Sequence, residues 1–187
     1  GAGSALYSQI GAEVVVESVC DEIASHFEYY ILEKDATVAK ERIVSKILRN
    51  LHETSKKIGC SIKDLASTLM VVAVNGSDYL IIHLGDGVIG YMDGSELKVA
   101  SNPSNGEFVN TTTFITSSDA IKCMKVMKGS IRNINGFVLM TDGTSASLYQ
   151  KRSGTLSAVI SEIFRYMKYL PIKVVEQQIQ ASLELVV

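Results

Sequence analysis

The spacing of hydrophobic residues changes twice along this 187-residue chain, and this order of segments limits the folds it can adopt. From Ser8 to Leu32, and again from about Ala36 to Ile58, apolar side chains recur every three or four residues, which predicts two long amphipathic helices. Asp35 is a candidate N-cap for the second helix, and Gly59 is a candidate stop. Because the connection is short, we expect the two helices to be antiparallel neighbours.

The middle of the chain has the spacing of β-strands. The predicted strands are 68–74, 78–84, 88–92, 97–100, 108–116, 121–127 and 136–140. The first four look like consecutive hairpins, joined by short turns rich in Gly, Asp, Asn and Ser. Helical spacing returns from Leu156 to Met167, and Pro171 begins a last helix. The sequence therefore predicts an α+β fold, a four-layer αββα sandwich in which antiparallel helix pairs flank two antiparallel sheets.

Composition narrows the class of protein further. A hydrophobic content of 47% over 187 residues suits one well-filled core, so we expect a single domain. The net charge of -2 argues against a nucleic-acid partner. No apolar run reaches the length of a membrane span and no secretory signal pattern opens the chain, so we expect a cytoplasmic protein without a membrane partner. The three cysteines fit neither a disulfide framework nor a zinc site, and we expect them to be reduced and buried.

Two Asp-Gly pairs stand at the ends of apolar strands. Asp86 follows the run that ends at Leu84, and Asp142 follows the run that ends at Met140. A carboxylate at a strand end, next to a flexible glycine, is typical of metal sites with oxygen ligands. The same dipeptide is also a common turn signal, which is how we interpret Asp93-Gly94. The small residues of the opening Gly1-Ala2-Gly3-Ser4 could let the backbone approach a ligand closely.

These motifs, in their order, resemble the metal-dependent protein serine/threonine phosphatases of type 2C (the PPM family), particularly the compact bacterial branch. The resemblance spans nearly the whole chain and rests on short motifs. They are Gly1-Ala2-Gly3-Ser4, Ala66-Ser67-Thr68-Leu69, Gly85-Asp86-Gly87, Gly106-Glu107 with Asn110-Thr111-Thr112, and Thr141-Asp142-Gly143. The resemblance implies that residues 1–187 form one phosphatase domain that lacks its N- and C-terminal strands.

The resemblance also implies a chemistry. Such enzymes hydrolyse phosphoserine or phosphothreonine in proteins through a water that bridges two Mg²⁺ or Mn²⁺ ions, and a third ion can bind more weakly. In this sequence Asp142 and Asp86 match catalytic metal ligands, and Gly1 matches a glycine that supplies its carbonyl. The implied partners are a phosphoprotein substrate and a cognate Ser/Thr kinase.

Several acids of the family pattern are missing from this sequence. No aspartate precedes Gly1, no acidic pair follows the last helix, and a phosphate-binding arginine has no counterpart. Two divalent ions need several carboxylates, so a second function stays open: a catalytically inactive, phosphatase-like module that binds a signalling protein. A hydrolase with an N-terminal nucleophile is disfavoured, because Gly1 has no side chain to attack with.

Other polar residues near these motifs have simpler interpretations. Asn110, Thr111 and Thr112 are expected on the exposed face of an edge strand, and Glu107 in a loop. We expect His83, three residues before Asp86, to be a strand histidine with ordinary hydrogen bonds.

Overall fold

The computed structural model describes residues 2–103 and 112–184, with the backbone alone for 182–184. The chain forms two compact units. The first comprises Gly1–Gly87 and Ser101–Arg132, and the second comprises Val88–Ala100 and Asn133–Val187. The chain therefore crosses from one unit to the other directly after the first Asp-Gly motif.

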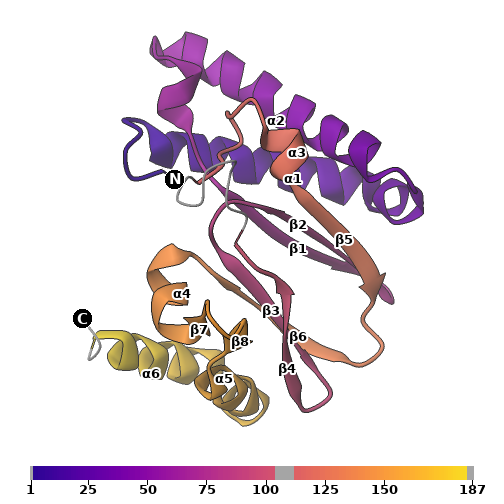
Figure 1. Ribbon diagram of the computed structural model, residues 1–187, viewed down its shortest axis with the longest axis vertical. Coiled ribbons are helices and arrows are strands. Elements are labelled where there is room, and N and C mark those ends of the chain that lie inside the picture. The colour runs from indigo at the N-terminus through magenta and orange to yellow at the C-terminus, as the bar shows by residue number, and fades with distance from the viewer. Residues whose placement is uncertain (1, 104–111, 185–187) are drawn as a thin grey trace. The chain divides into compact units, whose positions relative to one another are not determined.

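The first unit begins with the two predicted helices, α1 (Ser8–Leu32) and α2 (Ala36–Ile58), which pack side by side (Figure 1). The Asp35 carboxylate accepts a hydrogen bond from the backbone N–H of Thr37, and Gly59 adopts a left-handed conformation after α2. Both are the capping roles expected from the sequence. The limits and caps of this helical hairpin are thus confirmed.

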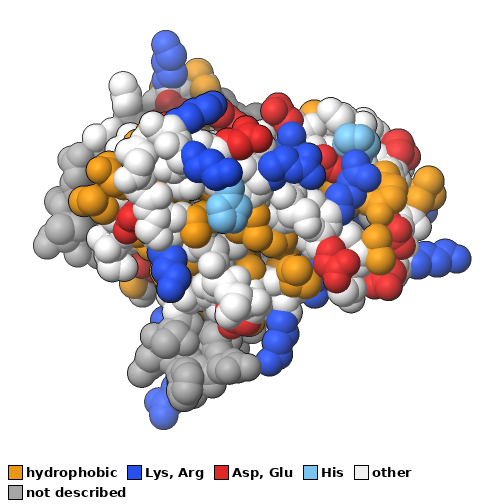
Figure 2. Space-filling view, turned by 90° about the horizontal axis from the view of Figure 1, so that it is seen from above, with side chains coloured by type: hydrophobic (Ala, Val, Ile, Leu, Met, Phe, Trp, Pro, Cys, Tyr) orange, Lys and Arg blue, Asp and Glu red, His pale blue; other side chains and the backbone are white. Residues whose placement is uncertain are grey.

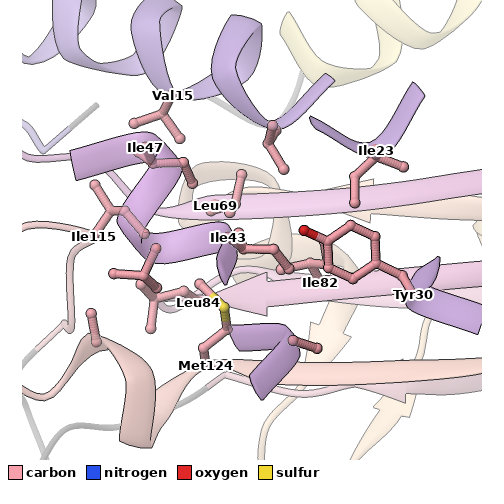
Figure 3. Close-up of a cluster of buried hydrophobic side chains, with 14 of the residues drawn as sticks. Val15, Ile23, Tyr30, Ile43, Ile47, Leu69, Ile82, Leu84, Ile115 and Met124 are labelled. Carbon is pink, nitrogen blue, oxygen red and sulfur yellow. The ribbon is translucent and has the colours of Figure 1, made fainter. Parts of the chain in front are cut away.

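One three-stranded sheet completes the core of the first unit. It contains β1 (Leu69–Asn75), β2 (Asp78–Leu84) and β5 (Lys125–Ser130), in the order β1-β2-β5, and both pairings are antiparallel. Alternate residues of β2, such as Leu80, Ile82 and Leu84, join side chains from α1 and α2 in one hydrophobic cluster (Figure 3). The side chains between them, such as His83, therefore lie on the opposite face of the sheet.

A glycine allows α1 to approach the short helix η1 (Ile62–Leu65). A Cβ atom at Gly11 would lie only 2.0 Å from the carbonyl oxygen of Leu65. Any other residue at position 11 would push the two segments apart, so this contact accounts for a glycine within a helix. The contact fixes the start of α1 beside the strand entry at Ala66.

The second unit is built around a sheet in the order β4-β3-β6. Its strands are β3 (Val88–Asp93), β4 (Glu96–Ser101) and β6 (Ile134–Met140), and β3 pairs with β6 in antiparallel register. The chain continues through α4 (Asp142–Leu148), the short pair β7 (Tyr149–Gln150) and β8 (Thr155–Leu156), α5 (Ala158–Tyr169) and α6 (Ile172–Glu184). Buried Val88, Met140, Tyr149 and Ile160 form its core.

The predicted α+β class is confirmed, because helices pack with a three-stranded sheet in each unit and all the described pairings are antiparallel. The expected strand limits of β2 are confirmed, and those of β1, β3, β4 and β6 differ by at most two residues.

Other sequence predictions were wrong in detail. Gly85-Asp86-Gly87 does not close a hairpin, since β2 and β3 belong to different sheets. The segment 121–127 begins as the short helix α3 (Ala120–Cys123). The carbonyl oxygens of Ser117 and Asp119 accept hydrogen bonds from the N–H groups of Ala120 and Cys123, and β5 therefore begins only at Lys125. Of the predicted strand 108–116, residues 108–111 lie outside the described residues, and Thr112 forms only an isolated bridge. The cysteines are free but not buried: Cys20 is exposed, and Cys60 and Cys123 are half-buried.

The described surface agrees with a chain of mixed charge. Figure 2 shows Lys and Arg side chains interspersed with Asp and Glu over the face that carries α1 and α2. None of the helices within the described ranges combines the length and the apolar character that crossing a membrane requires.

Candidate functional site

Asp86 lies where the chain leaves one sheet for the other. The residue before it, Gly85, has a φ of +123°, and a Cβ atom there would lie 2.4 Å from Cγ2 of Thr68 on the entry to β1. Only glycine combines this dihedral with such a close approach. The glycine is thus needed to bring the Asp86 backbone out of the buried strand β2.

The Asp86 side chain is half-buried and is oriented by a threonine. The hydroxyl of Thr112 donates a hydrogen bond of 2.7 Å to Oδ2 of Asp86, across 26 residues of sequence. No described residue donates a hydrogen bond to the other oxygen, Oδ1, which leaves it available as a ligand. Thr112 was expected on an exposed strand face. Sequence reasoning missed this contact because nothing in a run of threonines indicates which of them bonds to a distant acid.

Thr112 also lines a polar cavity of about 720 Å³ within the first unit. Six of its lining residues carry hydroxyl groups: Ser4, Thr112, Thr113, Thr116, Ser117 and Ser118. Ala2 lines the same cavity and is held there by a hydrogen bond of 3.0 Å from its N–H to the carbonyl oxygen of Ala66. The start of the chain and the partner of Asp86 therefore share one cavity.

A second group of polar residues lies on the sheet face opposite α1 and α2. His83 pairs directly with Lys125 in the β2–β5 register, so the two side chains share that face. Nδ1 of His83 lies 2.6 Å from the hydroxyl of Ser101, whereas its buried Nε2 has no hydrogen-bond partner among the described residues. The Lys125 ammonium donates to the carbonyl oxygen and to Oδ1 of Asn102, at 2.8 and 2.9 Å.

The environment keeps His83 uncharged near neutral pH. Burial lowers the pKa of the imidazole to about 4, with a further lowering from the positive charge of Lys125 and an opposing rise from Asp86. Both charges therefore act on the same ring. The expectation of a histidine with ordinary hydrogen bonds holds for Nδ1 only.

Asp142 is the first residue of α4, in the second unit. Its side chain is exposed, and an acidic residue in the first turn of a helix is favoured by the helix dipole. Its backbone carbonyl accepts a hydrogen bond of 3.3 Å from the buried hydroxyl of Ser145. Asp142 thus presents its carboxylate at the end of β6, as the sequence suggested.

The three predicted ligands are distributed as follows. Asp86 belongs to the first unit, Asp142 to the second, and Gly1 lies outside the described residues. Their convergence on one site stays a prediction. The structure brings Asp86 together with Thr112 and with the cavity that Ala2 lines.

The donor atoms suit a hard divalent ion, although the described residues do not complete a centre. Asp86 offers an anionic oxygen without a hydrogen-bond donor among the described residues, and Asp142 offers an exposed carboxylate, which are the ligands that Mg²⁺ and Mn²⁺ prefer. Within the described ranges, no three His, Cys, Asp or Glu side chains are grouped so that they could hold a metal ion.

The family model for protein phosphatase 2C matches residues 1–184. Among solved structures, a bacterial serine phosphatase is similar, with a TM-score of 0.65 at 13% identity, over 97% of this chain and 76% of that one. PppA, a key regulatory component of T6SS in Pseudomonas aeruginosa, is similar with a TM-score of 0.52 at 15% identity, over 100% of this chain and 76% of that one.

At such low identities the solved structures establish a shared fold and no more, and no curated protein matches the sequence. The family assignment rests on the model match, which extends over nearly the entire chain and confirms the resemblance predicted from the motifs. The chain belongs to the protein phosphatase 2C family.

Proposed function

We propose that this protein hydrolyses phosphoserine and phosphothreonine in proteins with the help of bound Mg²⁺ or Mn²⁺. The observation that carries the proposal is the environment of Asp86. A carboxylate at the exit of a buried strand is oriented by Thr112, one of its oxygens has no described hydrogen-bond donor, and the chain start lies on the adjoining cavity. In a chain of this family, these features support a metal-binding role for Asp86.

The proposed ligands are Asp86, Asp142 and the carbonyl group of Gly1. When bound, two ions, with a third held more weakly, would activate water and neutralise the charge that develops on the phosphoryl oxygens. Thr112 would limit the rotation of the Asp86 carboxylate, so that less conformational entropy is lost when a ligand binds. The hydroxyl-lined cavity offers hydrogen bonds to the polypeptide around the phosphorylated residue.

The proposal takes residues 1–187 as one phosphatase domain that acts in the cytoplasm on phosphoproteins made by a cognate Ser/Thr kinase. A signalling role is in keeping with the similarity in fold to PppA, which is itself a regulatory component.

A phosphatase assay on the full-length protein tests the proposal directly. We expect hydrolysis of phosphoserine and phosphothreonine peptides that requires Mn²⁺ or Mg²⁺ and stops with EDTA. Asp142→Asn and Asp86→Asn should each lower kcat/KM by about a hundredfold or more, since each removes an anionic metal ligand. Asp21→Asn, which changes an exposed aspartate of α1, is the matched control and should leave the rate unchanged.

The same assay separates the enzyme from a binding module. Folded wild-type protein that binds a phosphopeptide but shows no turnover with either metal would reject the enzymatic proposal and favour the inactive module.

A further inference from the structure

Lys125 is a partly buried cation with spare bonding capacity. It is the first residue of β5, and burial lowers the pKa of its ammonium group. An ammonium group has three N–H donors, and two of them are used by the carbonyl oxygen and Oδ1 of Asn102. No carboxylate among the described residues lies within ion-pair distance of Nζ. A partly desolvated positive charge with a third donor that no described residue takes up favours an anion as its partner.

The position of Lys125 is fixed by a frame of hydrogen bonds. Its strand partner is His83, whose Nδ1 lies 2.6 Å from the hydroxyl of Ser101. Ser101 in turn directly precedes Asn102, which accepts both hydrogen bonds from Lys125. The ammonium is therefore held at one place on the sheet, unlike an exposed lysine that moves freely in solvent, and little side-chain entropy remains to be lost on binding a ligand.

The frame also lies near Asp86. His83 precedes Asp86 by three residues, and the charges of both Asp86 and Lys125 act on its imidazole. Asp86 and Lys125 nevertheless form no ion pair with each other, as no such contact exists among the described residues. A carboxylate and an ammonium that are near one histidine but remain unpaired can bind different parts of one ligand: a cation at the carboxylate and an anion at the ammonium.

We propose that the Lys125 ammonium, held on Asn102, binds the phosphoryl group of a phosphate monoester beside Asp86. The identity of the ligand rests on the proposed function, whereas the anion preference rests on the contacts of Lys125 itself. Lys125 is then a substrate-binding residue that places the phosphoryl group near the proposed metal ligand Asp86.

The competing explanation is a purely structural lysine that ties Asn102 to the start of β5. The two explanations differ in the role of the charge: a structural tie needs only donors to Asn102, and an anion site needs an uncompensated positive charge. The isosteric change Asn102→Asp separates them, because it retains an acceptor for Lys125 and supplies a carboxylate that pairs with the ammonium.

The test is a titration of the full chain with inorganic phosphate, followed by ³¹P NMR and by calorimetry, in Mg²⁺ and again in EDTA. Wild type is compared with Lys125→Met, Lys125→Arg and Asn102→Asp. Lys34→Met is the matched control, since it removes an exposed lysine of the same unit, in the connection between α1 and α2, away from the hydroxyl-lined cavity. Circular dichroism confirms that each variant is folded.

We expect Lys125→Met and Asn102→Asp to weaken phosphate binding by about ten- to a hundredfold, the loss expected for one charge-assisted hydrogen bond. Lys125→Arg should retain most of the affinity, and Lys34→Met all of it. With a phosphopeptide substrate, Lys125→Met should raise KM more than it lowers kcat.

Two results would overturn the inference: phosphate affinity unchanged in both Lys125→Met and Asn102→Asp, or an equal loss in Lys34→Met, which would indicate a general charge effect. Because phosphate binding is measured without turnover, an inactive wild type that still binds phosphate through Lys125 would reject the proposed enzyme and retain the anion site. An active wild type whose phosphate affinity does not depend on Lys125 would retain the proposed enzyme and reject the anion site.

Discussion

At the scale of single residues, two positions around Asp86 carry consequences that can be measured. Gly85 accepts a dihedral that other residues avoid, and a Cβ atom there would clash with the Thr68 side chain. His83 is completely buried and has one ring nitrogen without a partner among the described residues. Both residues lie within three positions of the candidate ligand, so local backbone and charge effects converge on it.

Replacing Gly85 with alanine should destabilise the first unit. The new Cβ atom would clash with the Thr68 side chain at 2.4 Å. The alanine would also have to adopt the positive φ of Gly85, which costs additional strain. We expect the free energy of unfolding to fall by about 2 kcal/mol or more. Urea denaturation measures this change. Gly3→Ala is the control, because a Cβ atom at Gly3 would meet no atom within 4 Å, and an equal loss there would contradict the explanation.

His83 should make stability depend on pH in a defined window. Its pKa is about 4 in the folded chain, because of burial and the Lys125 charge, against 6.5 for an unperturbed histidine. The unfolded chain therefore binds the extra proton first as the pH falls, so the contribution of His83 is complete above pH 6.5 and is lost between pH 6.5 and 4. The full loss is up to about 3 kcal/mol.

Urea denaturation between pH 7.5 and 5 checks this window. His83→Asn should flatten the dependence of unfolding free energy on pH, whereas His52→Asn, at an exposed position of α2, should not. A wild-type protein with constant stability across this range would show that His83 titrates normally.

At the scale of elements, the helical hairpin of the first unit is tied to its sheet by one lysine. Lys128 of β5 donates to the carbonyl oxygens of Tyr30 and Ile31 at 3.2 and 2.7 Å, and to that of Glu33 as well. These carbonyls belong to the C-terminal end of α1, which has no basic residue in its own last turn. A cation from another element thus satisfies the helix end and its dipole.

Removing this cation should loosen the end of α1. Lys128→Met should lower the free energy of unfolding by about 1 to 2 kcal/mol, the value of a helix-end charge with hydrogen bonds. Amide hydrogen exchange should show faster opening in the last turn of α1. Lys34→Met, an exposed lysine in the connection after α1, is the control, and equal effects in both variants would contradict a specific cap.

At the scale of the whole molecule, the main question is whether Asp86 and Asp142, which belong to different units, bind the same ions. A ligand shared by two units stabilises the chain only when both of its attachment points are intact. If the aspartates share a metal centre, Mn²⁺ should raise the free energy of unfolding by about 2.7 kcal/mol at a hundredfold excess over its dissociation constant.

Asp86→Asn and Asp142→Asn should each remove most of this stabilisation, and the double variant should lose little more than either single variant. Thermal unfolding with and without Mn²⁺ measures the effect, and Asp21→Asn serves as control. Losses that add independently would mean that the two carboxylates bind metal at separate sites.

The sequence by itself determined the elements whose information is local. The limits and caps of α1 and α2 followed from a spacing of three to four residues, from Asp35 and from Gly59. The limits of β2 and the two Asp-Gly motifs could also be read directly, since the turn residues that bound them are adjacent in the chain. The motifs in order were sufficient to indicate the family.

Only the tertiary structure decided which distant residues meet. Gly85-Asp86-Gly87 has the composition of a hairpin turn, yet it carries the chain between two sheets, because strand pairing depends on packing over the whole unit. The bonds from Thr112 to Asp86 and from Lys125 to Asn102 join residues 26 and 23 positions apart. Polar side chains show no periodicity that identifies such partners, so the residues that orient the candidate site emerge only when the chain has folded.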